Sequence, residues 1–170
     1  MISRRDFCVA LAGAGSLMTA TPAAAQPWRT YRNPRFGTSI EYPDTFRPGR
    51  PPENGAGLGF TAADGASFSV YGSHNASDDN LAALEAFVRK NFSGGERVTY
   101  DARGPNWFVL SGTVGDKTFY DRHMLSHRGT IINAFQLLYP TRLQRAYDPI
   151  VTRMSRSLRA GRGVDTEGNP

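Results

Sequence analysis

The sequence predicts an α+β domain in which an antiparallel β-sheet of about six to seven strands is flanked by two helices. Strand-like runs rich in Val, Ile, Thr, Tyr, Phe and Trp follow one another between residues 97 and 138, separated by turns of only a few residues. Links this short join antiparallel neighbours. Two other segments repeat apolar residues at intervals of three and four, which is the spacing of a helix with one buried face. Strands and helices are therefore expected to pack as separate layers.

The first strands lie before residue 75. Residues 36–43 alternate apolar with polar side chains and end in proline, which indicates a half-buried strand. Residues 57–61 and 67–72 flank a turn that contains Asp-Gly, which indicates a hairpin. In the second arm of this hairpin, Phe68 and Val70 are expected on one face, and the opposite face is expected to carry Ser67, Ser69 and Tyr71.

The first helix is expected to open at Ser77-Asp78-Asp79. Short acceptor side chains cap free backbone N–H groups, and acidic residues suit the positive end of the helix dipole. Gly94-Gly95 is expected to end the helix. Between these two signals the apolar residues form one stripe at helical spacing: Leu81, Leu84, Phe87, Val88 and Phe92.

Four strand-like runs follow, at residues 97–103, 106–114, 117–126 and 130–138. The stretch 131–138 is apolar on both faces, so the last strand is expected to lie centrally, with a helix packed on each side.

A second apolar stripe at helical spacing predicts the closing helix: Leu143, Tyr147, Ile150 or Val151, Met154 and Leu158. Asp148-Pro149 suits an N-cap and a first helical position, so a helix that restarts or kinks there is expected. Residues 160–170 contain only small, charged and turn residues and are expected to form a flexible tail.

Residues 1–25 have the three-part pattern of a cleavable bacterial export signal. Its basic start contains Arg4 and Arg5, with Phe7 two positions on, and Ala23 and Ala25 supply the small residues of a cleavage site. The arginine pair with Phe7 resembles a twin-arginine signal. The general secretory route stays open, because the residues after Phe7 depart from that pattern. A periplasmic or secreted bacterial location is expected.

The mature chain is expected to form a single domain over residues 26–159. The full sequence contains 20 Lys and Arg against 15 Asp and Glu, so it is moderately basic. Its only cysteine, Cys8, lies in the export signal, which excludes disulfides and cysteine metal sites from the mature chain. Anionic envelope lipid or polymer suits this charge better than nucleic acid, which is not an expected partner.

Two short stretches carry a family resemblance. The first is Tyr31, the run Asn33-Pro34-Arg35-Phe36-Gly37-Thr38-Ser39-Ile40-Glu41-Tyr42-Pro43, and Phe46. The second is Leu138-Tyr139-Pro140 before a closing helix that ends at Ser157-Leu158. Both resemble the PsbP-like superfamily, which includes the Ran-binding Mog-type proteins. The resemblance implies an α/β/α sandwich and a module that binds or supports other proteins, and it transfers no site residue.

The candidate binding residues are His74, Asp121 and His123. Asp121 and His123 lie two positions apart on one face of a predicted strand, so both side chains can face one ligand. A metal would need a third ligand, for example His74, and this spacing matches no known metal signature. The competing interpretation is a solvated strand face on which Asp121 lies beside His123.

The sequence contains no Gly-x-Ser-x-Gly or other catalytic motif. We therefore expect an exported binding or accessory module rather than an enzyme, without cofactor or metal, not spanning the membrane, and with an envelope protein as partner. Two alternatives stay open. One is a small cofactor-free hydrolase that uses His74 or His123, and the other is a basic protein that binds anionic envelope lipid or polymer.

Overall fold

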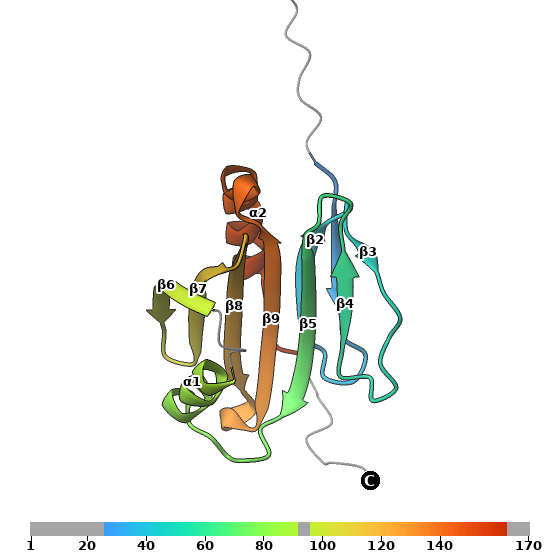
Figure 1. Ribbon diagram of the computed structural model, residues 1–170. Helices are drawn as coiled ribbons and strands as arrows, with labels where there is room; N and C mark the ends of the chain where they lie inside the picture. Colours follow the sequence, from blue (N-terminus) through green and yellow to red (C-terminus); the bar gives the residue numbers. More distant parts are fainter. Residues whose placement is uncertain (1–25, 92–95, 163–170) are drawn as a thin grey trace, which may run out of the picture.

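The computed structural model describes residues 26–91 and 96–162. Its main feature is a seven-stranded antiparallel sheet with the order β3-β4-β5-β9-β8-β7-β6 (Figure 1). The strands are β3 (Arg47–Pro48), β4 (Gly57–Thr61), β5 (Ser67–His74), β6 (Glu96–Arg103), β7 (Trp107–Val114), β8 (Lys117–Ser126) and β9 (Ile131–Pro140). The predicted α+β class, with an antiparallel sheet and two helices, is confirmed.

The prediction that the last strand lies centrally is also confirmed. β9 pairs with β5 on one side and with β8 on the other. It therefore joins the early β4–β5 hairpin to the β6–β8 meander. Two further strands, β1 (Trp28–Arg32) and β2 (Ser39–Pro43), form a separate two-stranded sheet. The sequence patterns did not indicate β1.

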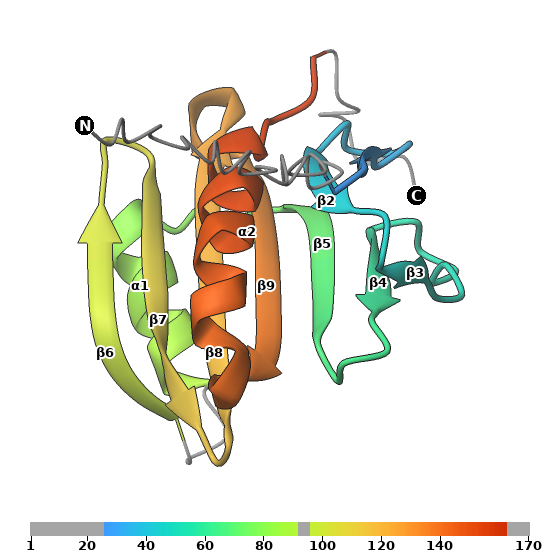
Figure 2. The same cartoon turned by 90° about the horizontal axis from the view of Figure 1, so that it is seen from above.

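The two helices cover opposite faces of the large sheet. Helix α2 (Gln144–Ser157) packs with β2 on one face, and helix α1 (Leu81–Lys90) packs on the other (Figure 2). The larger core is aromatic-rich and includes Phe60, Phe68, Phe135, Tyr147 and Met154. The smaller core, under α1, contains Leu84, Phe108, Leu110, Phe119 and Leu125. Helix α1 has only ten residues and covers only part of its face of the sheet, so the second core is small.

The predicted opening of α1 is wrong by a few residues. Asn80 is the N-cap, and its side-chain oxygen accepts a hydrogen bond of 3.0 Å from the Ala83 N–H. Asp78 has a φ of 50°, so it cannot belong to the helix. The Asn75 side chain holds this turn by bonding both the N–H and the carbonyl of Asp79. Of the predicted stripe Leu84 is buried, whereas Phe87 is 59% exposed.

Of the two predicted alternatives at Asp148-Pro149, a restart or a kink of the second helix, the restart is wrong. Helix α2 begins at Gln144 and contains Pro149. Pro149 has no backbone N–H, so the carbonyl of Arg145, four residues earlier, lacks its helical hydrogen bond. Both residues lie on the exposed side of the helix. Water can therefore take the place of the missing hydrogen bond. The expected stripe of Tyr147, Val151, Met154 and Leu158 is buried.

Several predictions fall outside the described residues. They are the export signal with Arg4, Arg5, Phe7, Ala23 and Ala25, the stripe residue Phe92, and residues 163–170 of the tail. The predicted end of the first helix at Gly94-Gly95 is wrong, because α1 ends at Lys90 with Asn91 as its C-cap. Within the described part of the chain, neither helix has the length and apolarity that a membrane span requires.

Candidate functional site

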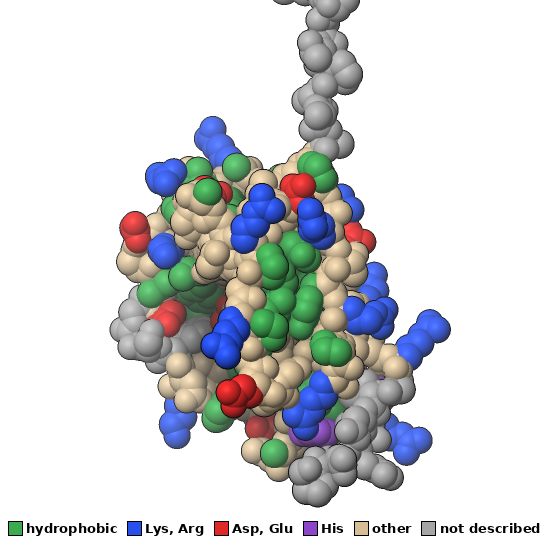
Figure 3. All heavy atoms as spheres, turned by 90° about the vertical axis from the view of Figure 1, so that its right-hand side faces the viewer, with side chains coloured by type: hydrophobic (Ala, Val, Ile, Leu, Met, Phe, Trp, Pro, Cys, Tyr) green, Lys and Arg blue, Asp and Glu red, His purple; other side chains and the backbone are tan. Residues whose placement is uncertain are grey.

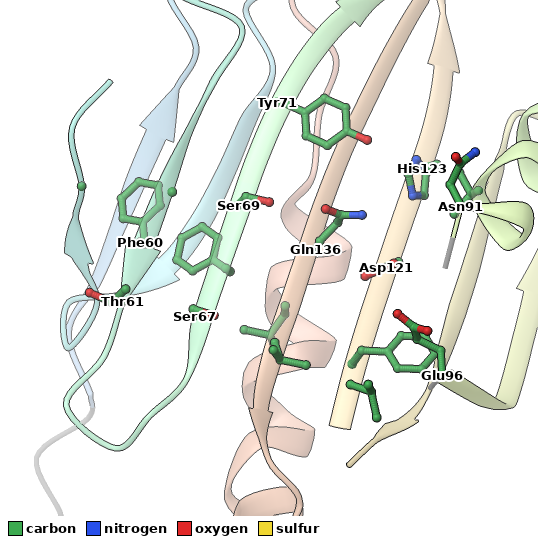
Figure 4. Close-up of a pocket in the computed structure, with 18 of the residues that line it drawn as sticks. Phe60, Thr61, Ser67, Ser69, Tyr71, Asn91, Glu96, Asp121, His123 and Gln136 are labelled. Atoms are coloured by element: carbon green, nitrogen blue, oxygen red, sulfur yellow. The ribbon is translucent and has the colours of Figure 1, made fainter. Parts of the chain in front are cut away.

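A groove of about 900 Å³ lies on the α1 face of the sheet, where α1 leaves β5 and β9 uncovered (Figure 4). This volume lies within the usual range of small-molecule sites. The strands supply the floor with Ser69, Tyr71, Gln136, Asp121 and His123. The rim includes Phe87 of α1, Asn91 at the C-cap of α1, Glu96 of β6, and Arg50 after β3.

Strand register explains why these polar side chains lie together. Ser69 pairs with Gln136, and Gln136 pairs with Asp121, so the three form one row across β5, β9 and β8. Tyr71, Ala134 and His123 form a second row two residues along. Residues two apart on a strand share a face, so both rows face the groove.

The two ends of the second row approach each other across β9. Ala134 between them is 0% exposed, and the rings of Tyr71 and His123 lie edge to face with their centroids 6.5 Å apart. In Figure 4 the Tyr71 hydroxyl points across β9 towards His123.

His123 is the least satisfied polar group of the groove. It is 1% exposed, and its ring lies flat on Phe108 with centroids 4.9 Å apart. Neither ring nitrogen has a hydrogen-bond partner in the described part of the chain. Burial lowers the pKa of His123 to about 4, so the ring is neutral at pH 7, with one donor and one acceptor nitrogen. Because leaving buried polar groups unpaired is costly, a ligand that bonds them gains affinity.

Asp121 is the second buried titratable group. It is 7% exposed, and burial raises its carboxyl pKa to about 7. A hydrogen bond with Gln136 opposes the shift, and the nearby charge of Glu96 adds to it. Burial, together with the Asp121 charge, also raises the pKa of Tyr71 to about 12. Near neutral pH the groove therefore holds a carboxyl group that is divided between its ionised and protonated forms.

The structure places two of the three sequence-predicted site residues together. Asp121 and His123 share the groove, and both are buried, so the interpretation of this strand face as solvated is wrong. Packing of the surrounding side chains leaves only 7% of Asp121 and 1% of His123 exposed. His74 lies on the opposite face of the sheet, where its ring packs against Phe36 with the two ring centroids 5.2 Å apart. Residues 26–91 and 96–162 contain no group of three or more metal-ligating side chains.

Sequence reasoning missed Tyr71, Gln136 and Glu96 as groove residues. A signal for Gln136 was present, because it is one of two amide side chains, with Asn133, that interrupt a mainly apolar strand. The short link between β8 and β9 sets a register that pairs Gln136 with Asp121. Glu96 carried no comparable signal, because β6 reaches the groove only through the arrangement of the whole sheet.

A second surface feature lies at the β3 end of the sheet. Figure 3 shows a hydrophobic patch on this side with Lys and Arg side chains around it. Several arginine side chains between residues 29 and 50 are exposed, among them Arg29, Arg35, Arg47 and Arg50.

Similarity to known proteins is confined to the fold. No protein-family model and no curated protein matches this sequence. The solution structure of cyanobacterial PsbP (CyanoP) from Synechocystis matches with a TM-score of 0.60 and 16% identity, covering 86% of this chain and 99% of that one. The Ran-binding protein Mog1p from Saccharomyces cerevisiae matches with a TM-score of 0.53 and 8% identity, covering 79% and 96%. The chain has a PsbP/Mog1-like fold, as its sequence resemblance implied.

Proposed function

We propose, on the premise of this PsbP/Mog1-like fold, that the chain is a non-catalytic binding module of the bacterial envelope that holds a small ligand in the groove. The observation that carries the proposal is His123. A buried imidazole with both nitrogens unpaired, facing a groove of about 900 Å³, is arranged to bond a ligand. The export pattern of residues 1–25 supports a periplasmic location, where the module would act beside an envelope protein.

Binding is better supported than hydrolysis. A histidine that activates a nucleophile needs a hydrogen bond to it and an orienting partner on its other nitrogen. His123 has neither among the described residues. One protein with this fold, Mog1p, is itself a Ran-binding protein. This supports a binding role for the fold without implying the same partner.

Ligand-screening NMR with a fragment library tests the groove. Fragments that bind are expected to shift the backbone signals of Ser69, Tyr71, Asp121 and Gln136. The variant His123→Leu is expected to weaken these fragments about tenfold or more, because the buried hydrogen bonds are lost.

The matched control is His74→Leu, which removes a histidine from the opposite face of the sheet and is expected to leave binding unchanged. Near-UV circular dichroism establishes that both variants are folded. Fragments that cluster outside the groove, or that bind His123→Leu as well as the parent, would contradict the proposal.

The hydrophobic patch at the β3 end of the sheet, with the Lys and Arg side chains around it, supports a second candidate function. This function is contact with anionic envelope lipid or polymer. Co-sedimentation with anionic vesicles is expected to fall as salt rises, because screening weakens exposed charge pairs. Replacing Arg47 and Arg50 by serine is expected to reduce co-sedimentation. The control replaces Arg142 and Arg145, which are exposed near the start of α2. Salt-independent binding, or equal losses in both double variants, would count against a specific electrostatic face.

A further inference from the structure

We infer that the groove takes a ligand with a protonated amine, which is bound by Asp121 and His123, and with an apolar part that lies against the α1 side. The inference rests on the proposed function, because it names the ligand class of the same groove.

The first argument is the sign of the charges around Asp121. Glu96 of β6 and Tyr71 of β5 face it. The groove residues of α1, Phe87 and Val88, and its C-cap Asn91 are uncharged. Among the described residues that line the groove, Arg50 is the one Lys or Arg, and it follows β3, which is four strands from β8. At about 4.8 Å per strand this separation is roughly 19 Å. An anionic ligand would be repelled at the Asp121 end, whereas a cation would be attracted.

The second argument is hydrogen-bond capacity. An ammonium group has three N–H donors. The Asp121 carboxylate accepts such bonds, and the neutral His123 ring offers one unpaired acceptor nitrogen on the same strand face. One ammonium group can thus bond both side chains. A metal ion is a poorer candidate, because no third ligand of the usual types joins these two within the described ranges.

The third argument is the apolar wall of the groove. Phe119 and Val114 of the sheet line the groove together with Val88 and Phe87 of α1. Phe87 is one of two large hydrophobic residues that remain exposed in the described part of the chain. A hydrocarbon or aromatic group attached to the amine would cover this surface and gain burial energy. The Tyr71 ring adds an aromatic face to which a cation is attracted.

The test compares two probes of nearly equal shape, 2-phenylethylamine and 2-phenylethanol, by NMR titration and calorimetry. At pH 8 the amine is expected to bind about tenfold more tightly, because its hydrogen bonds are charge-assisted. Its affinity is expected to fall about tenfold by pH 5, to that of the alcohol, because only about 1% of a carboxyl group with a pKa near 7 is ionised there. The binding of the alcohol is expected to change little over the same range.

The variant Asp121→Asn removes the charge with little change of shape. It is expected to abolish both the preference for the amine and the pH dependence. Asp116→Asn, in an exposed turn outside the groove, is the matched control and is expected to retain both. Carbon-13 NMR of the Asp121 carboxyl should also show that the amine lowers its pKa.

The outcomes separate the two proposals. If the alcohol binds the groove as tightly as the amine, or if pH dependence persists in Asp121→Asn, the amine inference is wrong and the binding groove stands. If the amine shifts no groove signal, the inference is overturned directly. If both probes and the fragments bind elsewhere, the proposed function fails as well.

Discussion

Phe135→Ala is expected to lower the free energy of unfolding by about 3–5 kcal/mol, which is the usual cost of removing a buried phenylalanine ring. Phe135 is 0% exposed on β9, the central strand. It faces the larger core, and its ring centroid lies 5.7 Å from that of Tyr120. Strands pair on both sides of β9, so the backbone cannot move to fill the cavity.

Urea denaturation measures this effect as a lower midpoint with an unchanged slope. Domains of this kind have total stabilities of about 5–15 kcal/mol, so the variant is expected to retain only a small margin. Phe87→Ala is the matched control. It removes the same ring from a side chain that is 59% exposed, and we expect a change of less than about 0.5 kcal/mol. Equal losses in the two variants would mean that the central core does not lie around β9.

Opposite pH dependences are expected when either titratable residue of the groove is removed. Folding lowers the pKa of His123 from 6.5 to about 4. Its contribution to stability is therefore present above pH 6.5 and is lost as the pH falls through 4, a change of about 3 kcal/mol. Folding raises the pKa of Asp121 from 3.8 to about 7. Its contribution is present below pH 3.8 and is lost as the pH rises through 7, a change of about 4 kcal/mol.

The two pH windows overlap between pH 4 and 6.5. In that range the stability changes due to His123 and Asp121 have opposite signs, so they largely cancel in the parent protein. Asp121→Asn leaves only the histidine contribution, and its stability relative to the parent is expected to fall towards acid pH. His123→Leu leaves only the carboxyl contribution, and its relative stability is expected to rise towards acid pH. Urea denaturation of the three proteins at pH 4.5 and pH 7.5 measures both slopes. Parallel pH dependences in the two variants would contradict the burial of this pair.

Most of the sheet was predictable from local patterns. Short turns between β6, β7, β8 and β9 leave antiparallel pairing as the available arrangement, and apolar residues on both faces of residues 131–138 indicated the central position of β9. Local patterns failed where a neighbour distant in the chain changed the outcome. The Asn75 side chain holds Asp79 in a turn outside α1, and exposure of Pro149 lets α2 continue through it.

Only part of the candidate site was predictable in the same way. A strand places Asp121 and His123 on one face by its two-residue period alone. The period does not say whether that face meets water. His74 was an equally plausible partner by sequence, and the odd–even alternation of β5 together with its pairing to β9 places it on the opposite face.

The sequence by itself determined the class of the fold, most of the segments that become its strands and helices, and the common face of Asp121 and His123, because these follow from side-chain periodicity and short turns. Only the tertiary structure decided that α1 covers part of that face and leaves a groove beside it. It also decided that Tyr71, Gln136 and Glu96 join the groove, and that burial shifts the pKa values of Asp121 and His123 in opposite directions. Burial and electrostatic fields arise from elements that lie far apart in the chain, so no local pattern encodes them.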